Sequence, residues 1–287
     1  MNQPKPGGVM KAPDFAYERP ATLADAIALL SRDDRDAAPL AGGQSLMPMM
    51  NFRMARPDLL VDLGSLGELK GIAASGSHLE IGAMTTYAEL AGSSLIAEQA
   101  PLMALALPHI AHSAIRNRGT LGGSVALADP AAEMPAVLLA LGAEIVLTGP
   151  AGSRTVPADA FFKGLFETDR RPDELVTLIR VPASDQHQRH GFYELARRHG
   201  DYAMAGVATV SSPDSLRIVF FAVSDRPVRA QAVEALLTSE DLGDPAAIDK
   251  ALAGLDAIAF AEDLNASART KRHLAGVVLK RALGQLA

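Results

Sequence analysis

The chain has 287 residues, of which 48% are hydrophobic and 21% charged, and its formal net charge is −6. This composition is typical of a globular protein long enough for two or three subdomains. The negative charge is spread along the chain, which argues against nucleic acid or an anionic membrane as a partner, because both attract clustered Lys and Arg.

Cysteine is absent, which narrows the chemistry further. The chain can form no disulfide and can ligate no iron–sulfur cluster or zinc ion through thiolates. His109 and His112 are three residues apart, but a partly buried histidine with a hydrogen-bond partner is a more common explanation than a metal ligand. The sequence shows neither a signal-peptide pattern nor an apolar run of membrane-spanning length, so we expect a cytoplasmic protein. Because the chain has no thiolate and no metal-binding histidine pattern, any redox chemistry must belong to an organic cofactor.

The first predicted helix follows Thr22, a candidate N-cap, and has Leu23, Ile27 and Leu30 at helical spacing. Residues 58–63 predict a strand. The opening therefore predicts a βαβ unit with a glycine-rich segment between its last two elements.

The middle of the chain alternates strands and helices. Strands are predicted at 79–83, 144–147, 155–157 and 174–181. Residues 85–90 predict the start of a helix, and residues 101–115 predict a further helix. Asp129 as N-cap and Pro130 at the first helical position predict another helix, which runs to about Leu141. Beyond the polar segment 183–190, the sequence predicts three antiparallel strands at 192–197, 203–210 and 216–222. Three helices are predicted to follow, at 228–237, 245–262 and 267–285. We expect an α+β protein with a boundary near 175–190.

Two glycine-rich segments, about eighty residues apart, are the most informative feature: Ala41-Gly42-Gly43-Gln44-Ser45 and Thr120-Leu121-Gly122-Gly123-Ser124. Backbone without side chains beside a hydroxyl suits a diphosphate, because amide N–H groups can approach its oxygens closely. Each segment alone is more often an ordinary turn. Neither matches G-x-G-x-x-G or G-x-x-x-x-G-K-[ST], which argues against a Rossmann domain and a P-loop. Together they could hold one extended dinucleotide from two sides.

Five motifs, in order along nearly the whole chain, resemble one known family. They are 39–48 with Arg53 and 57–63, then 115–124, 128–135, 197–203, and 269–271 followed by 275–277. They are similar to motifs of the FAD-binding medium subunits of molybdenum hydroxylases, the family of xanthine dehydrogenase, aerobic carbon monoxide dehydrogenase and quinoline 2-oxidoreductase.

The resemblance implies a two-domain fold. Residues 1–180 would form the FAD-binding domain, with a βαβ subdomain at about 1–63 and a five-stranded antiparallel sheet with helices at about 64–180. Residues 181–287 would form a C-terminal flavoprotein domain of three antiparallel strands and three helices. FAD would lie between the two subdomains.

The resemblance also implies cofactor-binding residues, with no catalytic residue and no metal ligand. Both glycine-rich segments would wrap the FAD diphosphate. Glu133 would accept hydrogen bonds from FAD hydroxyls, unless it is only a first-turn acid favoured by the helix dipole. Ile110 and Val176 would line the adenine, unless they are plain core, and Tyr202 would lie beside the isoalloxazine ring, unless it is a half-buried strand aromatic. Glu194 stands where several relatives have Lys, and a carboxylate near the flavin would disfavour an anionic reduced form.

The activity implied by the resemblance is that of an oxidoreductase subunit. FAD, bound non-covalently, would take electrons from the [2Fe-2S] clusters of a small subunit and pass them to an external acceptor. A large subunit with molybdopterin would oxidise the substrate, an N-heteroaromatic compound or CO, and the assembly would be a dimer of heterotrimers. The alternatives are a free-standing FAD oxidase or dehydrogenase with its own substrate pocket, and a structural subunit that has lost FAD. The small, apolar region 183–287 argues against the first alternative, and the intact glycine pairs argue against the second.

Overall fold

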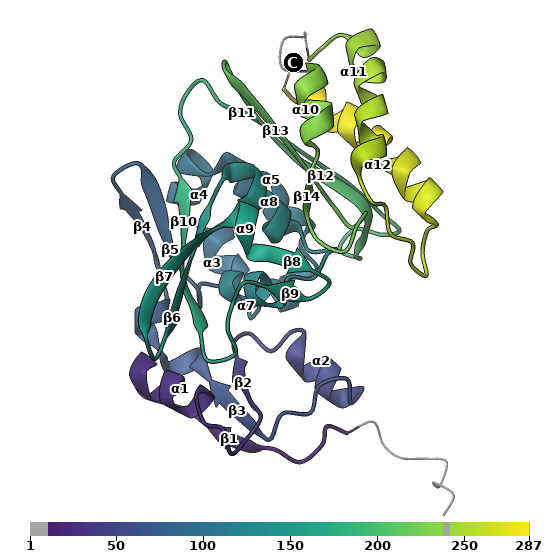
Figure 1. Ribbon diagram of the computed structural model, residues 1–287. Coiled ribbons are helices and arrows are strands. Elements are labelled where there is room, and N and C mark those ends of the chain that lie inside the picture. Colours follow the sequence, from purple (N-terminus) through teal and green to yellow (C-terminus); the bar gives the residue numbers. More distant parts are fainter. Residues whose placement is uncertain (1–10, 238–241, 287) are drawn as a thin grey trace, which may run out of the picture.

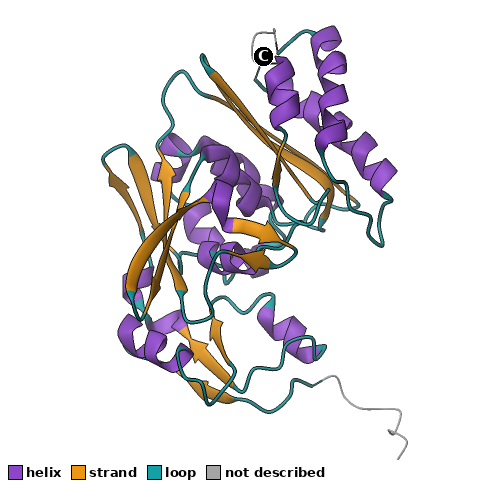
Figure 2. Cartoon of the chain, in the orientation of Figure 1, coloured by secondary structure: helices purple, strands orange, loops and turns teal. Residues whose placement is uncertain are grey.

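The computed structural model describes residues 11–237 and 242–286; the remaining parts of the two predicted domains lie outside the described residues. The three larger of the four sheets in the described residues follow one another in chain order, with helices between the second and third sheets and beyond the third (Figures 1 and 2). The arrangement is the predicted α+β fold.

The N-terminal unit is a three-stranded parallel sheet in the order β1–β3–β2. Its elements are β1 (Ala16–Glu18), α1 (Leu23–Leu30), β2 (Ala37–Leu40), α2 (Leu46–Asn51) and β3 (Leu59–Asp62). The Thr22 hydroxyl accepts from the N–H of Asp25 and caps α1 as predicted. The helix buries Ile27 and Leu30 in one cluster with β3 residues. The predicted βαβ opening included a strand before α1, without bounds, which is β1. The sequence did not predict β2 or α2, because each is only four to six residues long and lacks clear periodicity.

The central unit is the predicted five-stranded antiparallel sheet, in the order β4–β5–β10–β6–β7. Its strands are β4 (Ile72–Ser75), β5 (His78–Gly82), β6 (Glu144–Gly149), β7 (Gly152–Pro157) and β10 (Leu175–Pro182). The accompanying short elements are α3 (Tyr87–Ala91), α4 (Ser94–Gln99), α5 (Pro101–Ala106), α6 (Ser113–Arg116), α7 (Leu121–Leu127), α8 (Glu133–Leu141), α9 (Ala158–Phe161), β8 (Phe162–Gly164) and β9 (Glu167–Thr168). Residues 133–140 of α8 are all buried, which places this helix at the centre of the molecule.

The C-terminal unit is an antiparallel sheet in the order β11–β12–β13–β14 with three helices on one face. The three predicted strands are β11 (Arg189–Ala196), β12 (Ala203–Ser212) and β13 (Ser215–Phe221), and a two-residue edge strand, β14 (Val228–Arg229), joins them. The helices are α10 (Gln231–Leu237), α11 (Pro245–Ala251) and α12 (Ala268–Leu283). Phe192 and Phe221 join the central core on one face, whereas Phe220 and Leu279 join a second core on the helix face.

The single helix predicted over 101–115 is wrong. The structure has α5, a 3₁₀ turn at Leu107–His109, and then α6. Pro108 lacks the N–H that an α-helix needs, although Leu107 before it keeps helical backbone angles. Ala111 then adopts φ 44°, which ends the helical direction. The break turns Ile110 and Ala111 toward the cavity described below.

The helix start predicted at Asp129 is also wrong. α8 begins at Glu133 with Ala132 as N-cap, and the Asp129 carboxylate accepts instead from the N–H of Ala131 in a local turn. Likewise, the helix predicted over 245–262 is α11 followed by a 3₁₀ helix at Leu252–Ala257. The predicted end near Leu141 is confirmed, with Gly142 in the left-handed conformation.

Candidate functional site

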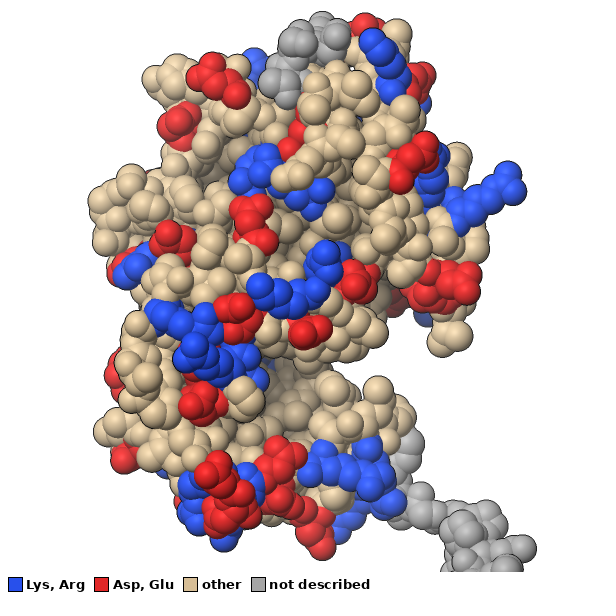
Figure 3. All heavy atoms as spheres, viewed as in Figure 1, with Lys and Arg blue, Asp and Glu red and all other residues tan. Residues whose placement is uncertain are grey.

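A cavity of about 470 Å³ lies between the N-terminal unit and the rest of the molecule. Figure 3 shows the surface hollowed at this place, between the lower lobe and the main body. All but one of the sequence-predicted site residues line it, namely Ala41, Gly42, Gly43, Gln44, Ser45, Ile110, Thr120, Gly122, Gly123, Ser124, Glu133, Val176 and Tyr202. The exception is Leu121, which is fully buried in the central core. The fold thus brings segments from four distant parts of the chain to one cavity.

The two glycine-rich loops, residues 41–45 (the first loop) and 119–124 (the second loop), touch each other. A Cβ on Gly42 would lie 2.1 Å from the carbonyl oxygen of Arg118, and one on Gly123 would lie 3.4 Å from the Ala41 Cβ. A Cβ on Gly122 would lie 2.4 Å from the Cβ of Ala83 at the end of β5. Gly42 and Gly122 are therefore required because backbone packs against them, before any ligand is considered.

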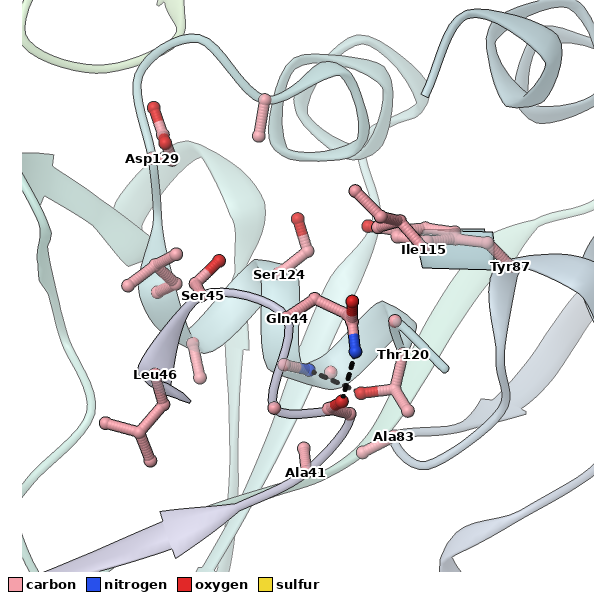
Figure 4. Close-up of a pocket in the computed structure, with 18 of the residues that line it drawn as sticks. Ala41, Gln44, Ser45, Leu46, Ala83, Tyr87, Ile115, Thr120, Ser124 and Asp129 are labelled. Carbon is pink, nitrogen blue, oxygen red and sulfur yellow. Dashed lines mark hydrogen bonds between the residues drawn. The ribbon is translucent and has the colours of Figure 1, made fainter. Parts of the chain in front are cut away.

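The backbone N–H groups of the first loop are available to a ligand. No group of the described chain accepts from the N–H of Gly43, Gln44 or Ser45. Gly43 has φ 71°, a conformation that favours glycine, and the Gln44 side-chain amide donates to the carbonyl oxygen of Gly42 (Figure 4). Successive unpaired N–H groups in a turn suit the oxygens of an anion such as a diphosphate.

The second loop uses its N–H groups internally. Leu121 donates to the Thr85 carbonyl, Gly122 to the Ala83 carbonyl, and Ser124 to the Thr120 carbonyl. Gly123 donates to the Thr120 hydroxyl, which caps α7 (Figure 4). The N–H groups of residues 121–124 are therefore already used, and what these residues offer the cavity is glycine surface and the Ser124 side chain.

The Ser124 hydroxyl comes close to a buried tyrosine. It interacts with the hydroxyl of Tyr87, whose pKa burial raises well above its ordinary value. Ser45 lines the same cavity from the first loop and makes no capping hydrogen bond (Figure 4). The Ser45 hydroxyl is thus available to donate to a ligand, whereas the Ser124 hydroxyl is shared with Tyr87.

The opposite wall is apolar, with one cation. Ile110 and Val176 are 7% and 5% exposed, and Leu175 lies beside them. Arg170 is the one Lys or Arg among the described residues that line the cavity. One of its nitrogens donates to the carbonyl oxygens of residues 171, 172 and 174, which fixes the guanidinium at this wall.

The remaining wall is acidic. Glu133 is only 8% exposed, and burial raises its pKa to about 7. Burial also raises the pKa of Asp129, whose carboxylate interacts with the Tyr202 hydroxyl. Tyr202 is 66% exposed at the cavity mouth, just before β12, so it is not the half-buried strand aromatic that was weighed as an alternative.

Glu194 lies behind the cavity rather than in its wall. Its carboxylate forms an ion pair with His109, with Nδ1 and Oε1 3.3 Å apart, and this contact raises the pKa of His109. The more common explanation of His109, a partly buried histidine with a partner, is therefore the right one.

The sequence did not single out Tyr87 or Arg170, and it assigned Asp129 to a helix cap. Arg170 lies six residues before the predicted adenine-lining Val176, but nothing local distinguishes it from a surface arginine. The described part of the chain contains no cluster of His, Asp and Glu that could hold a metal ion. Nor does any helix in residues 11–237 or 242–286 have the length and apolar character needed to cross a bilayer.

Free amides, two hydroxyls, an apolar wall and a single guanidinium suit one elongated ligand that carries a diphosphate and flat rings. The fold and the site thus define a flavoprotein that holds its dinucleotide between two subdomains. Residues 13–184 match the family described as the FAD binding domain in molybdopterin dehydrogenase, and residues 190–286 match the CO dehydrogenase flavoprotein C-terminal domain.

Relatives match along nearly their whole length. The chain is 37% identical to the caffeine dehydrogenase subunit beta of a Pseudomonas species, over 97% of this chain and 96% of that one. It is 40% identical to the carbon monoxide dehydrogenase medium chain of Afipia carboxidovorans, over 94% and 95%. The structure superposes on carbon monoxide dehydrogenase from Hydrogenophaga pseudoflava with a TM-score of 0.91 at 40% identity, covering 96% and 98% of the two chains. Quinoline 2-oxidoreductase from Pseudomonas putida gives a TM-score of 0.89 at 35% identity, covering 95% and 96%.

The chain belongs to the family of FAD-binding medium subunits of molybdenum hydroxylases. It is an oxidoreductase subunit whose cofactor is FAD, as its sequence motifs predict.

Proposed function

We propose that this chain is the electron-transfer subunit of a heterotrimeric molybdenum hydroxylase. In this assembly, electrons reach FAD from [2Fe-2S] clusters of a small partner subunit and leave to an external acceptor. Substrate is oxidised at molybdopterin in a large subunit. The cavity between the two glycine loops carries this proposal. The chain has no cysteine, so thiolate-held clusters must belong to another subunit.

The resemblance to the family suggests the roles of the site residues, and their place around the cavity supports these roles. When bound, FAD supplies the redox chemistry, and the protein supplies binding, orientation and electrostatics. The free N–H groups of Gly43, Gln44 and Ser45 would bind the diphosphate. Ile110 and Val176 would pack on the adenine. The second loop would present glycine surface and the Ser124 hydroxyl to the same ligand, with Tyr202 at the isoalloxazine end.

The division of labour follows the predicted domains. We assign residues 1–180 to FAD binding, with subdomains at about 1–63 and 64–180, and residues 181–287 to the C-terminal flavoprotein domain. Three separate clusters of buried residues support this division, although the central cluster also includes residues from β11 to β13.

The substrate would bind to the large subunit. Relatives are named for caffeine, carbon monoxide, nicotine and quinoline. We propose an N-heteroaromatic compound or CO as the substrate of the complete enzyme. We further propose a cytoplasmic enzyme. We propose that it is a dimer of heterotrimers, because identical protomers most commonly associate about a two-fold axis.

The test compares the isolated chain with the complex. The chain, purified alone, should contain one non-covalent FAD, released by acid precipitation, and substrate should not bleach its flavin absorbance. The chain purified with large and small subunits should contain molybdenum and iron, and substrate should bleach the same absorbance. Bleaching of the isolated chain by an N-heteroaromatic substrate would instead support a free-standing flavoenzyme.

A further inference from the structure

More acidic than basic side chains line the cavity. Asp129, Glu133 and Asp201 line it, and Arg170 is the one basic Lys or Arg side chain among its described lining residues. FAD adds the negative charge of its diphosphate. Like charges a few ångströms apart in a partly buried site repel strongly, so at least one of these carboxyl groups has reason to bind as the neutral acid.

Glu133 is the most buried of the three acids, and no described Lys or Arg forms an ion pair with it. It begins α8, and its own backbone N–H donates to its carboxyl group. A buried carboxylate without a cation is costly, whereas its neutral form costs much less and gains an O–H donor.

The buried Glu194 carboxylate behind Glu133 also favours the neutral form of Glu133. The Glu194 side chain is only 4% exposed, and its Oε2 is buried with no hydrogen-bond partner. The other oxygen of Glu194, Oε1, contacts Nδ1 of His109. The histidine is therefore the ion-pair partner of Glu194 and not of Glu133. Burial, Glu194 and Asp129 all raise the pKa of Glu133, whereas its own backbone N–H and His109 lower it, and burial is the largest of these effects. The remaining neighbours of Glu133 with titratable groups are Tyr87 and Tyr202, which are neutral near pH 7.

We propose that Glu133 faces the flavin cavity as a neutral carboxylic acid that donates its O–H hydrogen to bound FAD, and that Glu194, held in place by His109, is a positioning residue that favours this state. FAD binding is then coupled to one proton. Below about pH 7 the acid already carries the proton; at higher pH the protein must take one up, so affinity falls by up to about tenfold per pH unit.

The experiment measures the Kd of FAD for the deflavinated full chain between about pH 6 and about pH 8.5, by quenching of flavin fluorescence. The wild-type Kd should be constant at low pH and rise above about pH 7. Glu133→Gln, a neutral donor of nearly the same shape, should bind FAD with no pH break. Glu194→Gln should move the break to lower pH, and His109→Gln should move it to higher pH.

Asp201→Asn is the matched control, because Asp201 lines the same cavity but is exposed. It should shift every Kd by the same factor and leave the break in place. A flat wild-type curve, a break that survives in Glu133→Gln, or equal loss of affinity at every pH in Glu133→Gln would overturn the inference. A chain that bound no FAD at any pH would overturn it together with the flavin assignment, so the two failures are distinguishable.

Discussion

The first loop, at residues 41–45, and the second loop, at residues 119–124, resemble each other in sequence but differ in what their backbone N–H groups do. In the first loop, the N–H groups of Gly43, Gln44 and Ser45 have no acceptor in the described chain. In the second, the N–H groups of residues 121–124 all have one, because Thr120 caps α7 and the segment pairs with residues 83–85. Adjacent glycines beside a hydroxyl therefore do not by themselves identify an anion-binding backbone.

The glycines of the two loops also act differently. Gly43 provides a positive φ, whereas Gly42 and Gly122 provide close approach to other backbone. Gly42 joins the two loops, since it lies against the 118–119 backbone. We therefore expect the first loop to bind a diphosphate only when the second loop holds it in place.

The largest effect is expected at Gly42. In Gly42→Ala the new Cβ would meet the Arg118 carbonyl oxygen, a backbone atom that cannot move alone. Separating the loops should lower the free energy of unfolding by roughly 3 kcal/mol and abolish FAD binding. Thermal melting and the flavin content of purified protein measure both. Gly67→Ala, where nothing lies within 4 Å, is the control and should behave as wild type. A flavin-replete, stable Gly42→Ala protein would show that the loops do not depend on each other.

Gly43 should show the next largest effect. Gly43→Ala forces an alanine to φ 71°, which costs about 1–2 kcal/mol and tilts the free N–H groups. FAD affinity should fall by at least tenfold. Gly76→Ala, at φ 61° in the β4–β5 turn with open space around it, is the matched control. It should lose similar stability and no affinity. Equal Kd values for the two variants, measured by flavin fluorescence, would rule out a special role for the first-loop amides.

A substitution in the second loop should lower the stability of the protein more than its affinity for FAD. Thr120→Val removes the hydroxyl that accepts from the Gly123 N–H, a loss of about 1 kcal/mol for a helix cap. Because that hydroxyl is already committed to the cap, FAD affinity should fall only in proportion to the fraying of α7, by less than tenfold. Thr22→Val, at the N-cap of α1, should lose similar stability with unchanged affinity. A hundredfold loss of affinity in Thr120→Val without a change in melting temperature would make Thr120 a direct ligand.

The smallest effect on stability is expected at Tyr202. Its side chain is exposed, so Tyr202→Ala should change the free energy of unfolding by less than about 0.5 kcal/mol. If the ring shields one face of the flavin, reoxidation of the reduced protein by O₂ should be faster in stopped-flow traces. Tyr202→Phe keeps the ring and loses only the hydroxyl near Asp129, so its rate should match wild type. Identical rates for all three proteins would remove Tyr202 from the flavin environment.

Much of the fold could be predicted where the apolar pattern was long or where a capping residue marked the start of an element. Thr22 marked the start of α1, alternating apolar residues marked β5, and a strongly apolar run marked β10. The prediction failed where tertiary contacts override local propensity. Pro108 breaks the segment after α5, and the turn at Asp129 delays α8 until Glu133. The short strands of the N-terminal sheet have too few residues to show a period, and only their parallel pairing with β3 defines them.

The sequence by itself determined the family and the cofactor, and nearly all the site residues that it predicted line the cavity, because motif order and spacing are properties of the chain. Only the tertiary structure decided which N–H groups are free, since that depends on acceptors such as Thr85 and Ala83 that lie far from the loop in sequence. It also decided that Leu121 faces the core, that Arg170 reaches the cavity, and that Glu194 pairs with His109 behind Glu133. Hydrogen-bond partners and burial are set by which segments meet in space.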